Sequence, residues 1–231
     1  MKTSSFTTAP TLHYFSICGR GELARLVAAA GDLPIIDKTF DPPFDETGNW
    51  RQGYQEIGKN LGLPGTLPVL EHDDGFACFQ SNAIESYLSN IAPRFKDLTP
   101  SQRAKDLQFA LIKADVLAQA ESLLFKKITA GELAPVMARY YLTIEELLPS
   151  TGFINGLDFP TMADLSIVVV AKGCMPFQAA STLAGVAFDP LFYPKMERVA
   201  SAAMAYPAVA EYLANSEHKT LTNDPFDIMK K

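Results

Sequence analysis

The sequence predicts a small α/β domain followed by an all-helical domain, because strand-like and helix-like patterns fall in different halves of the chain. Short β-prone runs of comparable quality occur only before residue 90, at 11–15, 35–40, 67–71 and 76–79. Beyond residue 100 the apolar side chains recur at helical spacing, as in Leu107, Leu111, Ala114, Leu117 and Leu124. Residues 91–100 contain Pro93 and Pro100 and are typical of a linker.

The first domain opens with a β–α–β unit. Residues 11–15 form a short apolar run that a glycine-rich turn at 19–21 interrupts. Residues 22–30 favour a helix with an apolar face, and Gly31 is its expected end. Residues 35–40 then provide a second strand.

A hairpin and a further helix complete this domain. Residues 41–60 are rich in Gly and Pro and are expected to be mostly loop. The runs at 67–71 and 76–79 flank the turn signal Asp73-Asp74-Gly75, which predicts a β-hairpin. Residues 81–89 are expected to form the helix that follows it.

The second domain is expected to contain helices over 101–127, 132–148, 161–171 and 191–214. Thr161 and Asp164 form a capping box at the start of one of them. The Thr161 hydroxyl is expected to accept the N–H of Asp164, and the Asp164 carboxylate to accept the N–H of Thr161. We therefore assign this pair a structural role as a helix cap rather than a catalytic one.

Composition excludes several classes of protein. The chain has 231 residues, of which 48% are hydrophobic and 20% charged, as in ordinary globular proteins. A net charge of -6 without a basic run argues against nucleic-acid binding. Three cysteines without a CxxC pair, and three scattered histidines, argue against a disulfide framework or a metal site. No apolar run is long enough to span a membrane, so we expect a soluble protein in a reducing compartment.

Two separated segments carry the functional signal. The first is residues 12–22, and the second combines Leu-Pro-Val-Leu-Glu at 67–71 with Gln-Ser-Asn-Ala-Ile at 80–84. Together with Arg25, Tyr87-Leu88 and the Thr161-to-Asp164 motif, they resemble the cytosolic glutathione transferases. The resemblance is greatest to the sigma-type subgroup, which includes glutathione-dependent prostaglandin D synthases.

This resemblance covers nearly the whole chain and implies the glutathione transferase fold. Residues 10–91 would form a thioredoxin-like α/β domain that binds glutathione, and residues 101–231 an all-α domain that contributes the electrophile pocket. It also implies a cytoplasmic homodimer that conjugates glutathione, its co-substrate, to small apolar electrophiles in detoxification. Isomerase or peroxidase side activities fit the same subgroup, and no metal, nucleic acid or membrane is implied.

The reactive centre requires a group that stabilises the glutathione thiolate. A thiol of this kind has a pKa of about 8.5, so only a few per cent is ionised at neutral pH. The resemblance assigns the stabilising hydroxyl to Tyr14, and a core tyrosine on a strand is the structural alternative. Arg20 follows at the family spacing, and it would either assist the thiolate or pair with Glu22 to shape the loop.

The second segment would bind the glutathione backbone. Thr66 and Leu67 precede Pro68, which matches the family's cis-proline and would turn the Leu67 N–H and C=O toward the cysteinyl backbone. Gln80 and Ser81 open the next helix, whose positive end and Ser81 hydroxyl would receive the γ-glutamyl carboxylate. An ordinary strand-entry proline and an N-cap serine are the structural alternatives.

Three further glutathione contacts are implied by position. Trp50 lies in the loop where the family contacts the glycine carboxylate, unless it packs beneath that loop. Lys59 is the nearest candidate for the family's lysine contact, because the segment from Trp50 to Pro68 is longer than in sigma-type proteins. Asp115 falls where several classes reach the glutathione amine of a dimer partner, and an exposed helical aspartate is the alternative.

The electrophile pocket is expected between the two domains. Phe15 would line it from the first domain, and apolar residues from Leu117 to Phe125 would line it from the second.

Cys18 departs from the sigma-type pattern, which commonly has arginine there. It lies at a helix start beside Arg20, and both features lower a thiol pKa. The spacing is similar to that of omega-type relatives, whose cysteine forms a mixed disulfide with glutathione but usually precedes proline, where this chain has Gly19. The alternatives are therefore a Cys18-dependent thiol transferase or dehydroascorbate reductase, a buried inert Cys18, and a non-catalytic ligand-binding or structural protein.

Overall fold

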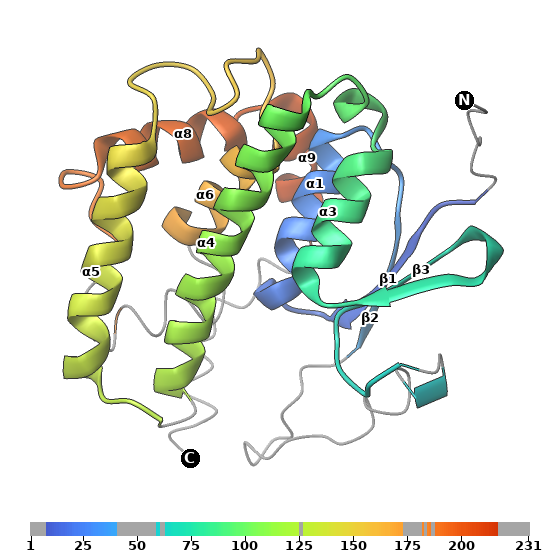
Figure 1. Ribbon diagram of the computed structural model, residues 1–231, viewed down its shortest axis with the longest axis horizontal. Helices are drawn as coiled ribbons and strands as arrows, with labels where there is room; N and C mark the ends of the chain where they lie inside the picture. The colour runs from blue at the N-terminus through green and yellow to red at the C-terminus, as the bar shows by residue number, and fades with distance from the viewer. Residues whose placement is uncertain are drawn as a thin grey trace.

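The computed structural model contains a four-stranded sheet and a helical half, packed side by side (Figure 1). It describes residues 8–40, 59–60, 63–124, 127–172, 182, 184–185 and 188–216. None of the helices within these residues combines the length and apolar character needed to cross a bilayer.

The sheet has the strand order β2-β1-β3-β4. Its strands are β1 (Thr11–Phe15), β2 (Ile36–Phe40), β3 (Val69–His72) and β4 (Phe76–Phe79). β1 pairs parallel with β2 through a helical crossover, and β3 pairs antiparallel with both β1 and β4. The four expected strands are confirmed, although β3 begins at Val69 rather than at residue 67, after Pro68, which has no N–H to donate to a ladder.

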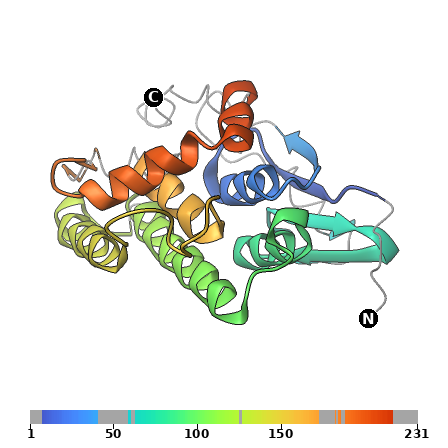
Figure 2. The same cartoon turned by 90° about the horizontal axis from the view of Figure 1, so that it is seen from above.

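Short helical turns connect some of the elements and longer helices form the rest. They are η1 (Gly19–Gly21), α1 (Glu22–Ala30), η2 (Asp73–Gly75), α3 (Ser81–Ile91), η3 (Pro93–Phe95), α4 (Pro100–Leu124), α5 (Ala130–Leu147), α6 (Met162–Lys172), α8 (Pro194–Met204) and α9 (Pro207–Asn215). α1 and α3 lie side by side between the sheet and the helical half, as Figures 1 and 2 show from two directions. The expected α/β unit followed by a helical half is confirmed.

Several of the expected helices differ by a few residues in their bounds, and two of these differences have a local cause. The region 191–214 is divided into α8 and α9, because Tyr206 precedes Pro207 and takes an extended conformation with φ -63° and ψ 129°. α5 begins at Ala130 rather than at residue 132, because Thr129 and Glu132 form a reciprocal capping box.

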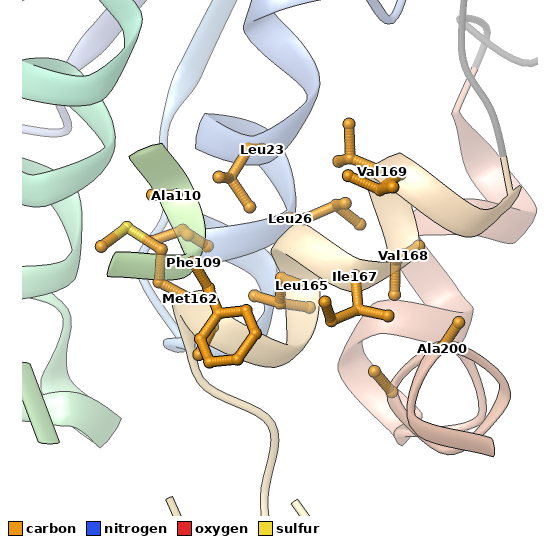
Figure 3. Close-up of a cluster of buried hydrophobic side chains, with 14 of the residues drawn as sticks. Leu23, Leu26, Phe109, Ala110, Met162, Leu165, Ile167, Val168, Val169 and Ala200 are labelled. Atoms are coloured by element: carbon orange, nitrogen blue, oxygen red, sulfur yellow. The ribbon is translucent and has the colours of Figure 1, made fainter. Parts of the chain in front are cut away.

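One continuous apolar core joins the sheet to the helices. Leu23 and Leu26 of α1 gather with Leu165 and Val169 of α6 in a cluster of buried side chains (Figure 3). All of α6 except Lys172 is buried, so this helix is the centre of the helical half. The linker segment takes part as well, because Phe95 in η3 is fully buried in the same core.

The start of α6 is held by a buried polar network. The Asp164 carboxylate accepts the backbone N–H groups of Thr161, at 2.9 Å, and Ile154, at 2.8 Å. The Thr161 hydroxyl, expected to accept the Asp164 N–H, donates to Asp106 on α4 at 2.6 Å and accepts from the Asn155 side-chain amide at 3.0 Å. The cap therefore also attaches α6 to α4.

We expect Asp164→Ala to lower the free energy of unfolding by about 2–4 kcal/mol, because two buried backbone N–H groups lose their acceptor. Urea unfolding followed by circular dichroism measures this change. The matched control is Asp158→Ala, an exposed aspartate in the preceding loop, which should change stability by less than about 0.5 kcal/mol. Equal effects at the two positions would contradict the role assigned to Asp164.

Candidate active site

Tyr14 lies near the end of β1 and is almost completely buried. Its hydroxyl oxygen accepts the backbone N–H of Arg20 at 2.9 Å, so its own hydrogen is left to donate. Its ring packs beside Phe15, with ring centroids 5.3 Å apart, and the Arg25 guanidinium lies 5.6 Å from the ring centroid. Burial raises the pKa of Tyr14 to about 12, although the Arg20 N–H opposes that shift. The hydroxyl is therefore protonated at neutral pH and suited to donate to an anion.

The glycines of η1 allow the turn to approach the tyrosine ring closely. A Cβ at Gly19 would lie 2.5 Å from the Tyr14 hydroxyl oxygen, and a Cβ at Gly21 would lie 2.5 Å from a ring carbon. Gly19 also has φ +41°, which an L side chain rarely adopts. Both positions therefore require glycine for the Arg20 N–H to reach the hydroxyl.

Arg20 is paired with Glu121 of α4 rather than with Glu22. Its Nε and Nη2 donate to the two carboxylate oxygens of Glu121, at 2.9 and 2.7 Å. Of the two alternatives for Arg20, the pair with Glu22 is wrong. The Glu22 carboxylate lies 3.7 Å from Arg25 and accepts the Tyr212 hydroxyl at 3.0 Å. The bidentate pair connects the turn after β1 directly to the helical half.

Arg25 is one of the residues that carry the family resemblance, but we predicted no role for it from the sequence. Its buried guanidinium donates to the carbonyl oxygens of Ile17, at 2.8 Å, and Phe15, at 3.1 Å, and to the Asp37 carboxylate at 2.7 Å. It thereby fixes the backbone between β1 and η1. A buried arginine with these partners holds the turn that surrounds Tyr14 in one conformation.

The second segment of the predicted site lies at the start of β3 and of α3. The Leu67-Pro68 peptide bond is cis, Leu67 is half-buried and Pro68 is buried. Gln80 is the residue before α3 and has φ 75° and ψ 115°, an uncommon conformation for a residue other than glycine. Ser81 is buried and is already the first residue of α3, so the N-cap is Gln80 rather than the serine. The Gln80 side chain makes no capping hydrogen bond.

The remaining predicted glutathione contacts are not brought together by the described residues. Trp50 lies outside them. Lys59 is exposed in a helical turn at 59–60, and Thr66 is exposed just before the cis bond. Asp115 is exposed on α4. Their roles stay predictions.

Of the residues predicted to contact the electrophile, only Phe15 lies beside Tyr14 among those that the structure describes. Phe15 packs beside Tyr14 in a small apolar cluster with Ile17, Phe40 and Leu67. Leu117 is fully buried in the main core, so it packs between elements and does not line an open cleft. Phe125 lies outside the described residues.

Cys18 directly precedes η1, is half-buried, and packs against the main core. Its carbonyl oxygen accepts the N–H of Gly21 at 3.1 Å. Among the residues that the structure describes, no group of three or more His, Cys, Asp and Glu side chains is placed to hold a metal ion.

Comparison with known proteins identifies this arrangement at the level of the fold. No protein-family model matches the sequence, and no curated protein matches it significantly. Solved structures do match, and each of those compared below covers 90% of this chain. A rat hPGDS complexed with a quinoline has a TM-score of 0.69 at 20% identity, with 98% of its own chain covered. A Pi-class glutathione S-transferase from Onchocerca volvulus also gives 0.69, at 17% identity and 93% coverage.

The chain has the glutathione transferase fold. A glutathione S-transferase from the hookworm Necator americanus, described as monomeric, matches as well, with a TM-score of 0.67, 20% identity and coverage of 90% of this chain and 97% of its own. Equal scores for hPGDS and a Pi-class protein mean that this glutathione transferase fold does not by itself distinguish a subgroup.

We expect Gly21→Ala to lower the free energy of unfolding by about 1–3 kcal/mol, because the added methyl would meet the Tyr14 ring at 2.5 Å. Thermal unfolding provides the measurement. In the matched control, Gly131→Ala, the methyl at the second residue of α5 meets nothing within 4 Å and should raise stability by about 0.5–1 kcal/mol. A Gly21→Ala variant as stable as the wild type would show that the turn does not require glycine there.

Proposed function

We propose that the protein is a glutathione transferase in which the Tyr14 hydroxyl stabilises the glutathione thiolate for attack on a small apolar electrophile. The observation that carries the proposal is the hydrogen bond from the Arg20 N–H to the Tyr14 oxygen, which leaves the hydroxyl hydrogen to donate to a ligand. A hydrogen bond donated to a thiolate favours the anion and lowers the pKa of the thiol.

The rest of the site supports a peptide-like anionic ligand. The N–H groups at the start of α3 and the positive end of its dipole favour the γ-glutamyl carboxylate beside Ser81. The backbone of Leu67, at the entry to β3, would pair with the cysteinyl unit, and Thr66 precedes it. Trp50 and Lys59, which precede Thr66 in the chain, are proposed to contact the glycine carboxylate.

Arg20 adds positive charge beside the reacting sulfur. Its guanidinium is held by Glu121 through two hydrogen bonds, while its backbone holds Tyr14. A fixed arginine stabilises a developing anion without reorganising when the reaction occurs. Phe15, beside Tyr14, would contact the apolar electrophile, together with Phe125 of the helical half.

The organisation of the enzyme is proposed from the same resemblance. A glutathione-binding domain over 10–91 and an electrophile-binding domain over 101–231 would form a cytoplasmic sigma-type enzyme. Leu107 and Leu111 are 40% and 45% exposed and lie on the face of α4 that carries Asp115. This apolar stripe supports a homodimer in which Asp115 reaches the partner's glutathione.

Tyr14→Phe tests the proposal. We expect kcat/KM for the conjugation of glutathione with an activated aryl halide to fall about 10–100-fold, because a hydrogen bond to an anion contributes about 1.5–3 kcal/mol. The pKa of the bound thiol, measured from the ultraviolet absorbance of the thiolate, should rise by about 1–2 units for the same reason.

Cys18→Ser is the companion variant, and it should keep conjugation within about twofold of the wild type. Full activity in Tyr14→Phe, combined with loss of thiol-transferase or dehydroascorbate reductase activity in Cys18→Ser, would replace the proposal with a Cys18 mechanism. Failure of the wild type to bind immobilised glutathione, with no turnover of any electrophile, would favour a non-catalytic protein.

Glu121→Gln tests the part assigned to Arg20. The variant should lower kcat/KM about 3–10-fold, because the guanidinium loses its ionic partner and its fixed position. The free energy of unfolding should change by less than about 1 kcal/mol, since both side chains are about one-third exposed. Steady-state kinetics and urea unfolding separate the two effects, and unchanged kinetics would remove Glu121 from the mechanism.

A further inference from the structure

A polar contact ties α9, near the end of the chain, to the start of α1. The two helices pack beside each other (Figure 1). Tyr212 of α9 is half-buried, and its hydroxyl donates to Oε2 of Glu22, the first residue of α1, at 3.0 Å. Glu22 is 6% exposed, so the hydroxyl supplies a donor to a carboxylate that is largely removed from water. The bond therefore joins the helical half to the residue that directly follows the η1 turn.

The same carboxylate oxygen faces Arg25. Nη1 of Arg25 lies 3.7 Å from Glu22 Oε2, which is beyond hydrogen-bond distance. Nη1 donates instead to the Ile17 carbonyl oxygen at 2.8 Å, and Nη2 donates to the Phe15 carbonyl oxygen at 3.1 Å. The Tyr212 hydroxyl thus donates to an oxygen for which Arg25 is a second donor close at hand, and Arg25 remains on the backbone carbonyls.

Arg25 relates this cluster to the candidate active site. Its guanidinium lies 5.6 Å from the centroid of the Tyr14 ring. The two carbonyls that it holds belong to the segment that leads from Tyr14 to Arg20. At the end of that segment, the Arg20 N–H donates to the Tyr14 hydroxyl oxygen at 2.9 Å. A displacement of the guanidinium would therefore move the backbone that orients the hydroxyl.

We propose that Tyr212 is a positioning residue, whose hydroxyl holds Glu22 so that Arg25 stays on the backbone that orients Tyr14. The inference rests on the proposed function, in which the Tyr14 hydroxyl stabilises the glutathione thiolate. It assigns to α9 a part in the reaction although none of its residues is proposed to touch the substrates.

The direction of the effect follows from the competition for Glu22. Without the Tyr212 hydroxyl, the buried carboxylate oxygen has one donor fewer. The adjacent Arg25 guanidinium favours the charged form of the carboxylate, so the charge persists and attracts Nη1. Movement of Nη1 from 3.7 Å toward hydrogen-bond distance would lengthen its bond to the Ile17 carbonyl. The Tyr14 hydroxyl would then be placed less well for the thiolate.

The experiment measures the pKa of enzyme-bound glutathione, from the ultraviolet absorbance of its thiolate, together with kcat/KM for conjugation. Tyr212→Phe should raise this pKa by about 0.3–1 unit and lower kcat/KM about 2–10-fold. Val209→Ala is the matched control, because it removes buried apolar atoms from the same helix and leaves the hydroxyl in place. It should lower the melting temperature by about 3–8 °C and leave the pKa of the thiol within about 0.2 units of the wild type.

Glu22→Gln shows whether Tyr212 acts through the carboxylate. The amide keeps the size of the side chain but carries no charge to attract Arg25. In this background, Tyr212→Phe should change the pKa of the bound thiol by less than about 0.2 units, whatever shift Glu22→Gln produces by itself.

A rise of the pKa in Tyr212→Phe that disappears in the Glu22→Gln background would support the inference. An unchanged pKa in Tyr212→Phe, an equal rise in Val209→Ala, or a rise that persists in the Glu22→Gln background would overturn it and leave Tyr212 a structural contact. A wild type with no thiolate signal would overturn the proposed function itself, and this inference with it.

Discussion

The apolar contact between α1 and α6 is the constraint on which the rest of the structure depends. α1 is the crossover of the parallel β1–β2 pair, so its position is tied to the sheet, and α6 is the buried centre of the helical half. Leu23 and Leu26 share one core with Leu165 and Val169. Because this core is continuous, the two halves have one relative placement, and polar groups at their boundary meet in fixed pairs.

Those polar pairs hold the groups around Tyr14 in fixed positions. Arg20 can hold the Tyr14 hydroxyl through its backbone and Glu121 through its side chain only because α4 lies against η1 at that position. Arg25 also holds this turn, by donating hydrogen bonds to the Phe15 and Ile17 carbonyl oxygens. The tyrosine is thus surrounded by groups that are themselves held, which is the condition for an orientation that persists when a ligand binds.

The local sequence pattern was sufficient to predict most of the strands and helices and to propose part of the site. The expected strands and the helix ending before Gly31 were predicted because their periodicity and turn residues act over a few positions. The motif around Tyr14 and Ser81 also predicted where a ligand would bind, and that site stays a prediction. The division of 191–214 at Tyr206 was missed, although the following Pro207 was a readable signal.

The sequence alone determined the order of the elements, the glycine turn after β1 and the two segments from which the candidate site is proposed, since each is encoded by neighbouring residues. Only the tertiary structure decided that Arg20 pairs with Glu121, 101 residues away, and not with Glu22 two residues on. It also decided that Glu85 and Lys113 are buried together, and that Leu117 lies in the core. Charge partners across a domain boundary depend on how helices pack, and helix spacing within one segment carries no information about that choice.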